Sequence, residues 1–313
     1  AWDDYGNALL EMKKAKGASQ VLYGFVTKDA KADRAKVGEL LATHGSALDA
    51  LRSGAGKSRA SYAYQWERGF AMDVPSLMES QMLVNLAICR ARSLAEEGKG
   101  REAAELLLDA GQFGRDLGSD AVIISEMISL AALALVLDEL KAHSLSGTLS
   151  KEDLLQVGRE LEILDRGFPR HGGALLSEVL GMGYSFRTTD DGMLMRLFGP
   201  RAFQELKSRM TEAAAASVGP WVEEQAVGKR HEQEFRKMKN PLVATSIPDF
   251  SSSGRVNRER LAQLRLLRAA VQYKATGEVL GLPDPFGATL RTSNVAEKLK
   301  VWSIGADSLD YLA

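Results

Sequence analysis

The sequence predicts a mainly α fold: an irregular helical bundle followed by a small module of one C-terminal helix and a β-hairpin. Apolar residues recur at helical spacing along most of the 313-residue chain. Short breaks rich in Gly or Pro separate these segments, as at Gly98–Gly100. The helical pattern stops after Gly277, where turn-forming residues and two short runs typical of strands follow.

Helical patterns fill the first half of the chain. The expected helices are Trp2–Lys16, Asp33–Leu51, Asp73–Glu97, Arg101–Leu117 and Ser119–His143. Within the last of these, Ala121–Leu137 is the most apolar run and carries Glu126 near its middle. This run is slightly short for a bilayer and contains a charged residue, so it favours a central core helix over a membrane span.

Helical patterns continue in the second half, where they also indicate a domain boundary. The expected helices are Ser150–Asp165 with a capping-box start, His171–Tyr184, Pro200–Ser217, Trp221–Met238 and Val256–Lys274. Two prolines and four serines in Asn240–Ser253 interrupt the pattern. The sequence therefore predicts a helical bundle over 1–240, a linker or crossing loop over 241–254, and a helix plus β-hairpin module over 255–313, packed on the bundle.

The tail after Gly277 combines turn residues with alternating apolar residues. Pro283–Gly287 predicts a tight turn, because each proline fixes its φ and glycine accepts a positive φ. Ala288–Arg291 and Leu299–Ile304 are the expected strands, joined by a long polar loop. A lone hairpin is marginal in water, so we expect its apolar side to pack on the helix Val256–Lys274.

Composition bounds the classes of partner. The chain has 40 basic and 41 acidic residues, a net charge of -1, so we expect no nucleic-acid partner. The basic runs Lys229–Lys239 and Arg255–Arg268 have few interleaved aromatic residues and predict solvated helix faces. The single cysteine, Cys89, excludes an internal disulfide and lies in an apolar helical run, where a buried thiol is expected.

Three sequence motifs are characteristic of known binding or catalytic sites, and none of them is complete in this chain. Gly54–Ser58 resembles a phosphate-binding loop, but Leu51 stands where the first glycine is needed, so we expect a loop that binds no nucleotide. His231-Glu232 begins like a zinc-protease helix, but Phe235 replaces the second histidine. No Gly-x-Ser-x-Gly elbow is present, and a Ser-His-acid triad assembled in space stays open.

The most specific stretch is the tail, with DPFG at Asp284–Gly287 and VWSIGAD at Val301–Asp307. It resembles the C-terminal ends of type II secretion pseudopilins and of uncharacterised bacterial envelope families that join a membrane anchor, a helical body and this ending. In the major pseudopilin subunit the matching loop binds calcium, so the resemblance implies calcium at Ser303, Asp307 and Asp310. Alternatively, the two aspartates hydrogen-bond backbone N–H groups in the turn.

The resemblance implies a non-enzymatic protein of the bacterial cell envelope, periplasmic or exported, that acts on a protein partner. No cofactor other than calcium is expected, and membrane attachment is expected only through an anchor preceding Ala1. Two alternatives stay open. One is an enzyme with its site in a cleft of the helical bundle, and the other is a cytosolic helical adaptor.

Overall fold

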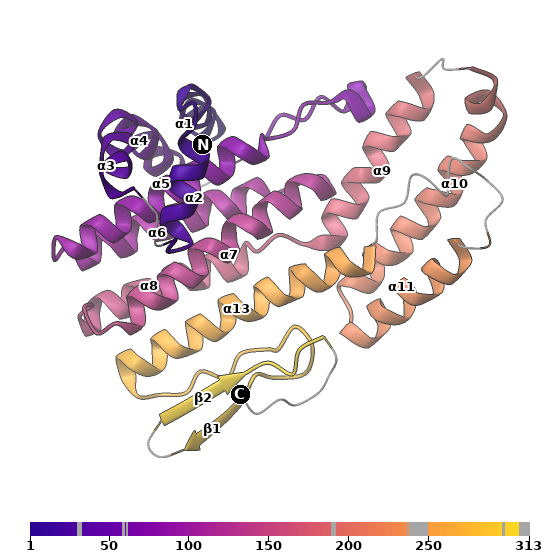
Figure 1. Ribbon diagram of the computed structural model, residues 1–313. Coiled ribbons are helices and arrows are strands. Elements are labelled where there is room, and N and C mark those ends of the chain that lie inside the picture. Colours follow the sequence, from indigo (N-terminus) through magenta and orange to yellow (C-terminus); the bar gives the residue numbers. More distant parts are fainter. Residues whose placement is uncertain are drawn as a thin grey trace.

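The structure is a computed structural model that describes residues 1–29, 33–57, 60, 62–188, 192–235, 237, 250–295 and 298–306. The described chain is mainly helical and ends in a two-stranded antiparallel hairpin, so the predicted fold class is confirmed. Figure 1 shows short N-terminal helices over a central layer of long helices, with a further group of helices at one side and the hairpin beneath.

The N-terminal helices are α1 (Trp2–Lys14), α2 (Ala18–Val26), α3 (Arg34–Thr43) and α4 (Gly45–Ala55), followed by the short 3-10 helix η1 (Trp66–Ala71). The prediction of one helix over 33–51 is wrong, because α3 ends and α4 begins at His44. At this break the His44 imidazole lies 3.1 Å from the Glu11 carboxylate of α1. The predicted loop over 53–59 starts later than expected, since 53–55 belong to α4.

The central layer consists of α5 (Leu77–Glu96), α6 (Gly100–Leu117), α7 (Ile123–Leu145) and α8 (Lys151–Arg166). α7 packs against α5 and α6 and is largely buried, as the sequence predicts. Gly114 lets α6 approach α7 closely, because an added Cβ would lie 3.2 Å from the Leu133 side chain. Ser150 and Asp153 form the predicted capping box at the start of α8.

The interior of this layer is apolar. Cys89 of α5 is buried as predicted, and burial raises the pKa of its thiol to about 12. A thiol with this pKa stays protonated at neutral pH and has little nucleophilic character. Within the described ranges, we find no helix with the length and apolar character needed to cross a membrane.

A second group of helices lies beside the central layer (Figure 1). It consists of α9 (His171–Thr188), α10 (Gly192–Ser217) and α11 (Trp221–Phe235). Their shared core contains Leu175, Leu206 and Met210, and Ile123 joins it from the start of α7. The prediction that this helix starts at Pro200 is wrong, because α10 begins at Gly192 and carries Pro200 in its interior, where the proline removes one backbone hydrogen bond.

α13 (Phe250–Thr276) lies along α7 and α8. It runs parallel to α7, and three polar contacts join the two helices in order: Asn257 to Glu126, Gln263 to Asp138, and Lys274 to the carbonyl of Leu145. The helix starts earlier than predicted, so residues 250–254 of the expected linker are helical. The other residues of that linker, 241–249, lie outside the described residues.

Three arginines of α13 do not belong to the solvated face that the sequence predicts over Arg255–Arg268, although Arg255 itself is 51% exposed. Arg258, Arg265 and Arg268 have side-chain exposures of 12%, 19% and 15%. Arg265 and Arg268 share Asp165 of α8 at 3.1 and 3.0 Å, and Arg258 binds Glu224 of α11 at 2.6 Å. Charge-assisted contacts of partly buried guanidinium groups are stronger than exposed ion pairs. These arginines therefore fasten α13 to α8 and α11.

The hairpin consists of β1 (Arg291–Val295) and β2 (Lys298–Trp302), with Arg291 opposite Trp302. The prediction of a first strand over 288–291 and a long loop is wrong. The strand starts where that prediction ended, because Leu290 instead packs in a small core with Leu282 and Ala269. The hairpin packs on α13, as expected, through Val301.

Candidate functional site

Of the three residues predicted to bind calcium, the structure describes only Ser303. Asp307 and Asp310 lie outside the described residues, so the calcium site stays a prediction. The Ser303 hydroxyl donates to Asp284 Oδ1 at 2.7 Å and accepts the Gly305 N–H at 3.2 Å. Across the described ranges, no group of three or more His, Cys, Asp or Glu side chains is placed to hold a metal ion.

Asp284, from the DPFG turn, organises the tail. Its carboxylate is buried and accepts three hydrogen bonds, from the Phe286 N–H at 3.0 Å, the Ser303 hydroxyl at 2.7 Å and the Ile304 N–H at 2.9 Å. Gly287 permits this approach, because a Cβ there would lie 2.8 Å from the Ile304 side chain. The two parts of the tail motif therefore bind one another, which gives both a structural role.

α13 and α11 hold this tail in place. Arg265 donates to the Pro283 carbonyl at 3.0 Å, and Arg258 donates to the Pro285 carbonyl at 2.5 Å. The Trp221 indole of α11 donates to the Ala306 carbonyl at 2.7 Å. Backbone carbonyls of the turn thus receive charge-assisted hydrogen bonds from two helix arginines. These contacts fix the tail beside the open end of the hairpin, where Arg291 pairs with Trp302, and the strands lie farther along α13 (Figure 1).

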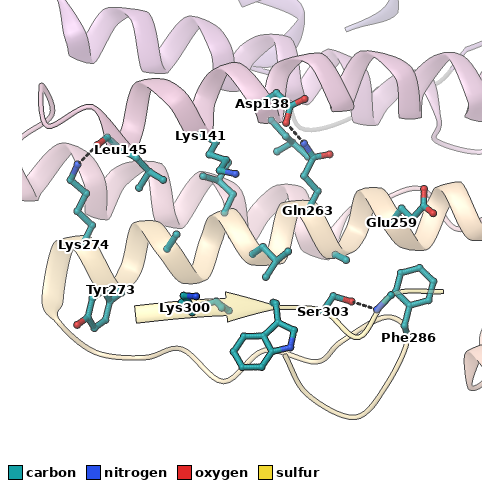
Figure 2. A pocket seen from close by; sticks show the side chains of 18 residues that line it. Asp138, Lys141, Leu145, Glu259, Gln263, Tyr273, Lys274, Phe286, Lys300 and Ser303 are labelled. Atoms are coloured by element: carbon teal, nitrogen blue, oxygen red, sulfur yellow. Dashed lines mark hydrogen bonds between the residues drawn. The ribbon is translucent and has the colours of Figure 1, made fainter. Parts of the chain in front are cut away.

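A groove of about 640 Å³ lies between α7, α13 and the hairpin. We call it the hairpin groove and define it by its lining residues Leu137, Lys141, Leu266, Ala270, Val301 and Trp302. Figure 2 shows it running along α13, from Glu259 and Phe286 at one end to Tyr273 and Lys274 at the other. Its floor is largely apolar, and its volume is in the range of ligand-binding clefts.

Lysines gather towards one end of the hairpin groove. Figure 2 places Lys141, Lys274 and Lys300 on the Tyr273 side of Asp138. The Asp138 carboxylate accepts a hydrogen bond from Gln263 at 2.6 Å. Lys141 is exposed and has no hydrogen bond or ion pair to any residue that the structure describes. This end therefore favours a negatively charged ligand group.

A second cleft, of about 860 Å³, lies at the other end of α13. His171 and Asn257 line it, and both bind the buried Glu126 of α7. Ser253 of α13 lies behind His171, with its hydroxyl 3.3 Å from the ring. We call Glu126, His171, Ser253 and Asn257 the α13 polar cluster.

The sequence alone predicted neither the hairpin groove nor the α13 polar cluster. The signal for the α13 polar cluster was Glu126, a charged residue in the most apolar run of the chain. The groove has no local signal, because residues from three separate elements line it. Neither protein-family models, nor curated proteins, nor solved structures gave a match to this chain.

Proposed function

We propose that this chain is a protein of the bacterial cell envelope that acts through protein contacts and holds an extended, apolar and acidic segment of a partner in the hairpin groove. The observation that carries this proposal is an apolar groove with lysines gathered at one end. The resemblance of the tail to the endings of envelope proteins supports the location.

The groove is long enough for a peptide segment. From Glu259 to Lys274 it follows α13 for about 22 Å at 1.5 Å per residue, which matches about seven residues of extended chain. Each large apolar side chain buried there would contribute about 1.5–3 kcal/mol. Since association itself is costly, two or three such anchors are needed for a micromolar Kd, about −8 kcal/mol.

The strand β2 favours an extended ligand over a helical one. β2 pairs with β1 on one side, and no other strand among the described residues pairs with it. An unpaired strand edge offers backbone N–H and C=O groups that an extended peptide can bind. Backbone pairing with β2 would supply affinity, while the apolar floor selects side chains.

The lysines set the charge of the partner segment and its direction in the groove. Exposed ion pairs contribute only about 0.2–1 kcal/mol each, so they tune orientation and association rate more than affinity. A carboxylate near Lys141 meets a cation that has no partner in the described part of the chain. Added salt should therefore weaken binding moderately.

The test is selection of displayed random dodecapeptides on the purified chain, followed by fluorescence anisotropy with the enriched peptides. We expect peptides that combine apolar and acidic residues and bind with a micromolar Kd. Ala270→Glu puts a carboxylate into the groove and should weaken binding at least about tenfold. Ala142→Glu places the same group on the exposed face of α7 and should leave binding unchanged.

Two results would overturn the proposed groove function. One is the absence of any enriched peptide, and the other is enrichment of peptides that bind Ala270→Glu as tightly as the unchanged chain. The location has its own test in the full-length gene. An apolar segment of about 20 residues, or an export signal, upstream of Ala1 supports the envelope, and a start codon directly before Ala1 rejects it.

A further inference from the structure

The backbone edge of β2 borders the hairpin groove. Residues 300–303 all line the groove, although successive side chains of a strand point to opposite faces. Consecutive lining residues therefore indicate that the groove meets the edge of the strand and not one of its faces. Among the described residues, none from β1 lines the groove, and β1 pairs along the other edge of β2. The free edge of β2 thus faces the groove.

The chain makes a turn directly after β2, at one end of the groove. Gly305 has a φ of 72°, in the left-handed region that glycine adopts without strain, and it lines the groove. Ala306 follows and packs against the small core of Trp221, Ala262 and Phe286. The part of the chain that the structure describes therefore ends beside the Phe286 end of the groove.

The next seven residues have the chemistry that the groove favours. The sequence of 307–313 is DSLDYLA, with two acidic and three large apolar residues. These residues lie outside the described ones, and their chemistry follows from the sequence. In an extended chain Leu309 and Tyr311 share one face, and Asp310 lies on the other. The segment thus offers two apolar anchors for the floor of the groove and a carboxylate for its lysines.

The length of the 307–313 segment also matches the groove. Ala262 and Ala270 both line the groove and lie about 12 Å apart along the axis of α13. An extended chain that starts at Ala306 covers this distance in about three to four residues, so Leu309 reaches Ala270. Seven extended residues span about 23 Å, which is close to the length of the groove.

We propose that the 307–313 segment is a ligand of its own chain: it pairs with the free edge of β2 as a third antiparallel strand and fills the hairpin groove until a partner displaces it. This inference rests on the proposed function, because the partner segment competes for the same place. A segment tethered this closely has an effective concentration of about 1 mM. Even an intrinsic Kd of about 100 µM then fills the groove in about nine chains of ten and weakens partner binding about tenfold.

The first test is a disulfide trap in the full chain. Ala270→Cys combined with Leu309→Cys should form an intramolecular disulfide under mild oxidation. The native Cys89 does not compete, because it is buried and its pKa is raised to about 12. Ala142→Cys combined with Leu309→Cys is the matched control, since Ala142 is exposed on α7 and does not line the groove.

We expect the disulfide to Ala270→Cys to form at least about ten times faster than the control disulfide, as measured by non-reducing peptide mass spectrometry. The control position is the more accessible of the two, so accessibility alone would favour the opposite order. Equal rates, or faster closure in the control, would overturn the proposal.

The second test measures how strongly the 307–313 segment competes with a partner. Leu309→Asn combined with Tyr311→Asn removes both anchors, so the peptides selected for the groove should bind this variant about tenfold more tightly than the unchanged chain. Ser308→Asn, on the opposite face of an extended segment, is the control and should leave the Kd unchanged.

The two proposals fail in different ways. An equal Kd for the anchor variant and the unchanged chain overturns self-occupancy and leaves the groove function standing. Absence of peptide binding to every variant overturns the groove function, and the disulfide trap then decides on its own whether the 307–313 segment lies in the groove.

Discussion

The two halves of α13 lie in opposite kinds of environment. Its N-terminal half carries Ser253 and Asn257, which are buried and hydrogen-bonded to side chains of α7 and α9. Its C-terminal half forms a wall of the hairpin groove, where Ala270 is only half covered. The first half meets polar partners from its own chain, and the second leaves apolar surface open. The comparison suggests that one half secures the fold and the other is available to a partner.

The same helix pair spans both environments. α7 contributes Glu126 to the polar half and Lys141 to the groove half. Buried polar groups are costly unless they are satisfied, so changes in the first half should act on stability. Changes in the second half should act on binding with little effect on stability.

Glu126→Ala should give the largest effect. It leaves the His171 Nδ1–H and an Asn257 amide N–H buried without their acceptor, which should cost about 3–5 kcal/mol. Urea unfolding followed by circular dichroism measures the change. Asp138→Ala is the control on the same helix, because it removes only an exposed hydrogen bond to Gln263 and should cost less than about 1 kcal/mol. Equal losses of unfolding free energy in the two variants would contradict the conclusion that the N-terminal half of α13 secures the fold.

Asp284→Ala should give an intermediate loss of stability. It tests whether the Asp284 hydrogen bonds hold the hairpin that forms one side of the groove. Three donors, on Phe286, Ser303 and Ile304, lose their acceptor, which should cost about 2–4 kcal/mol. The loss should be local, since the hairpin contacts little besides α13. Hydrogen exchange should show faster exchange in residues 291–302 and little change in α7. Global unfolding with uniform exchange would show that the tail is integral to the bundle.

The sequence predicted the helices better than their ends and better than the sites. Helical periodicity is a local signal, so the buried α7 was recognisable from its own apolar run. The break at His44 was not, because its partner Glu11 lies in another helix. The first strand was misplaced for the same reason, since Leu290 is held by Leu282 and by α13 rather than by its neighbours in sequence.

The candidate sites depend on contacts between distant positions, and a single sequence holds no record of them. His171 lies 45 residues from Glu126 and 82 residues from Ser253, so no spacing rule joins them. The arginines of α13 looked solvated because their partners, Asp165 and Glu224, lie in other helices. The tail motif was recognisable, yet only the structure connects Asp284 with Ser303.

Calcium should have the smallest effect on stability. Adding it tests whether the C-terminal tail binds an ion in addition to packing on α13. Ser303 already donates to Asp284, so the predicted ligands that remain are Asp307 and Asp310. Two carboxylates make a weak site, with a Kd of about 1 mM at best. Calcium at about 10 mM would then stabilise the native state by about 1.4 kcal/mol, a rise of roughly 2–4 °C in Tm. Asp307→Asn should remove this rise and Ser303→Ala should keep it, although Ser303→Ala lowers the starting Tm by removing one bond to Asp284. A Tm that responds neither to calcium nor to chelator would mean that the tail closes the groove by packing alone.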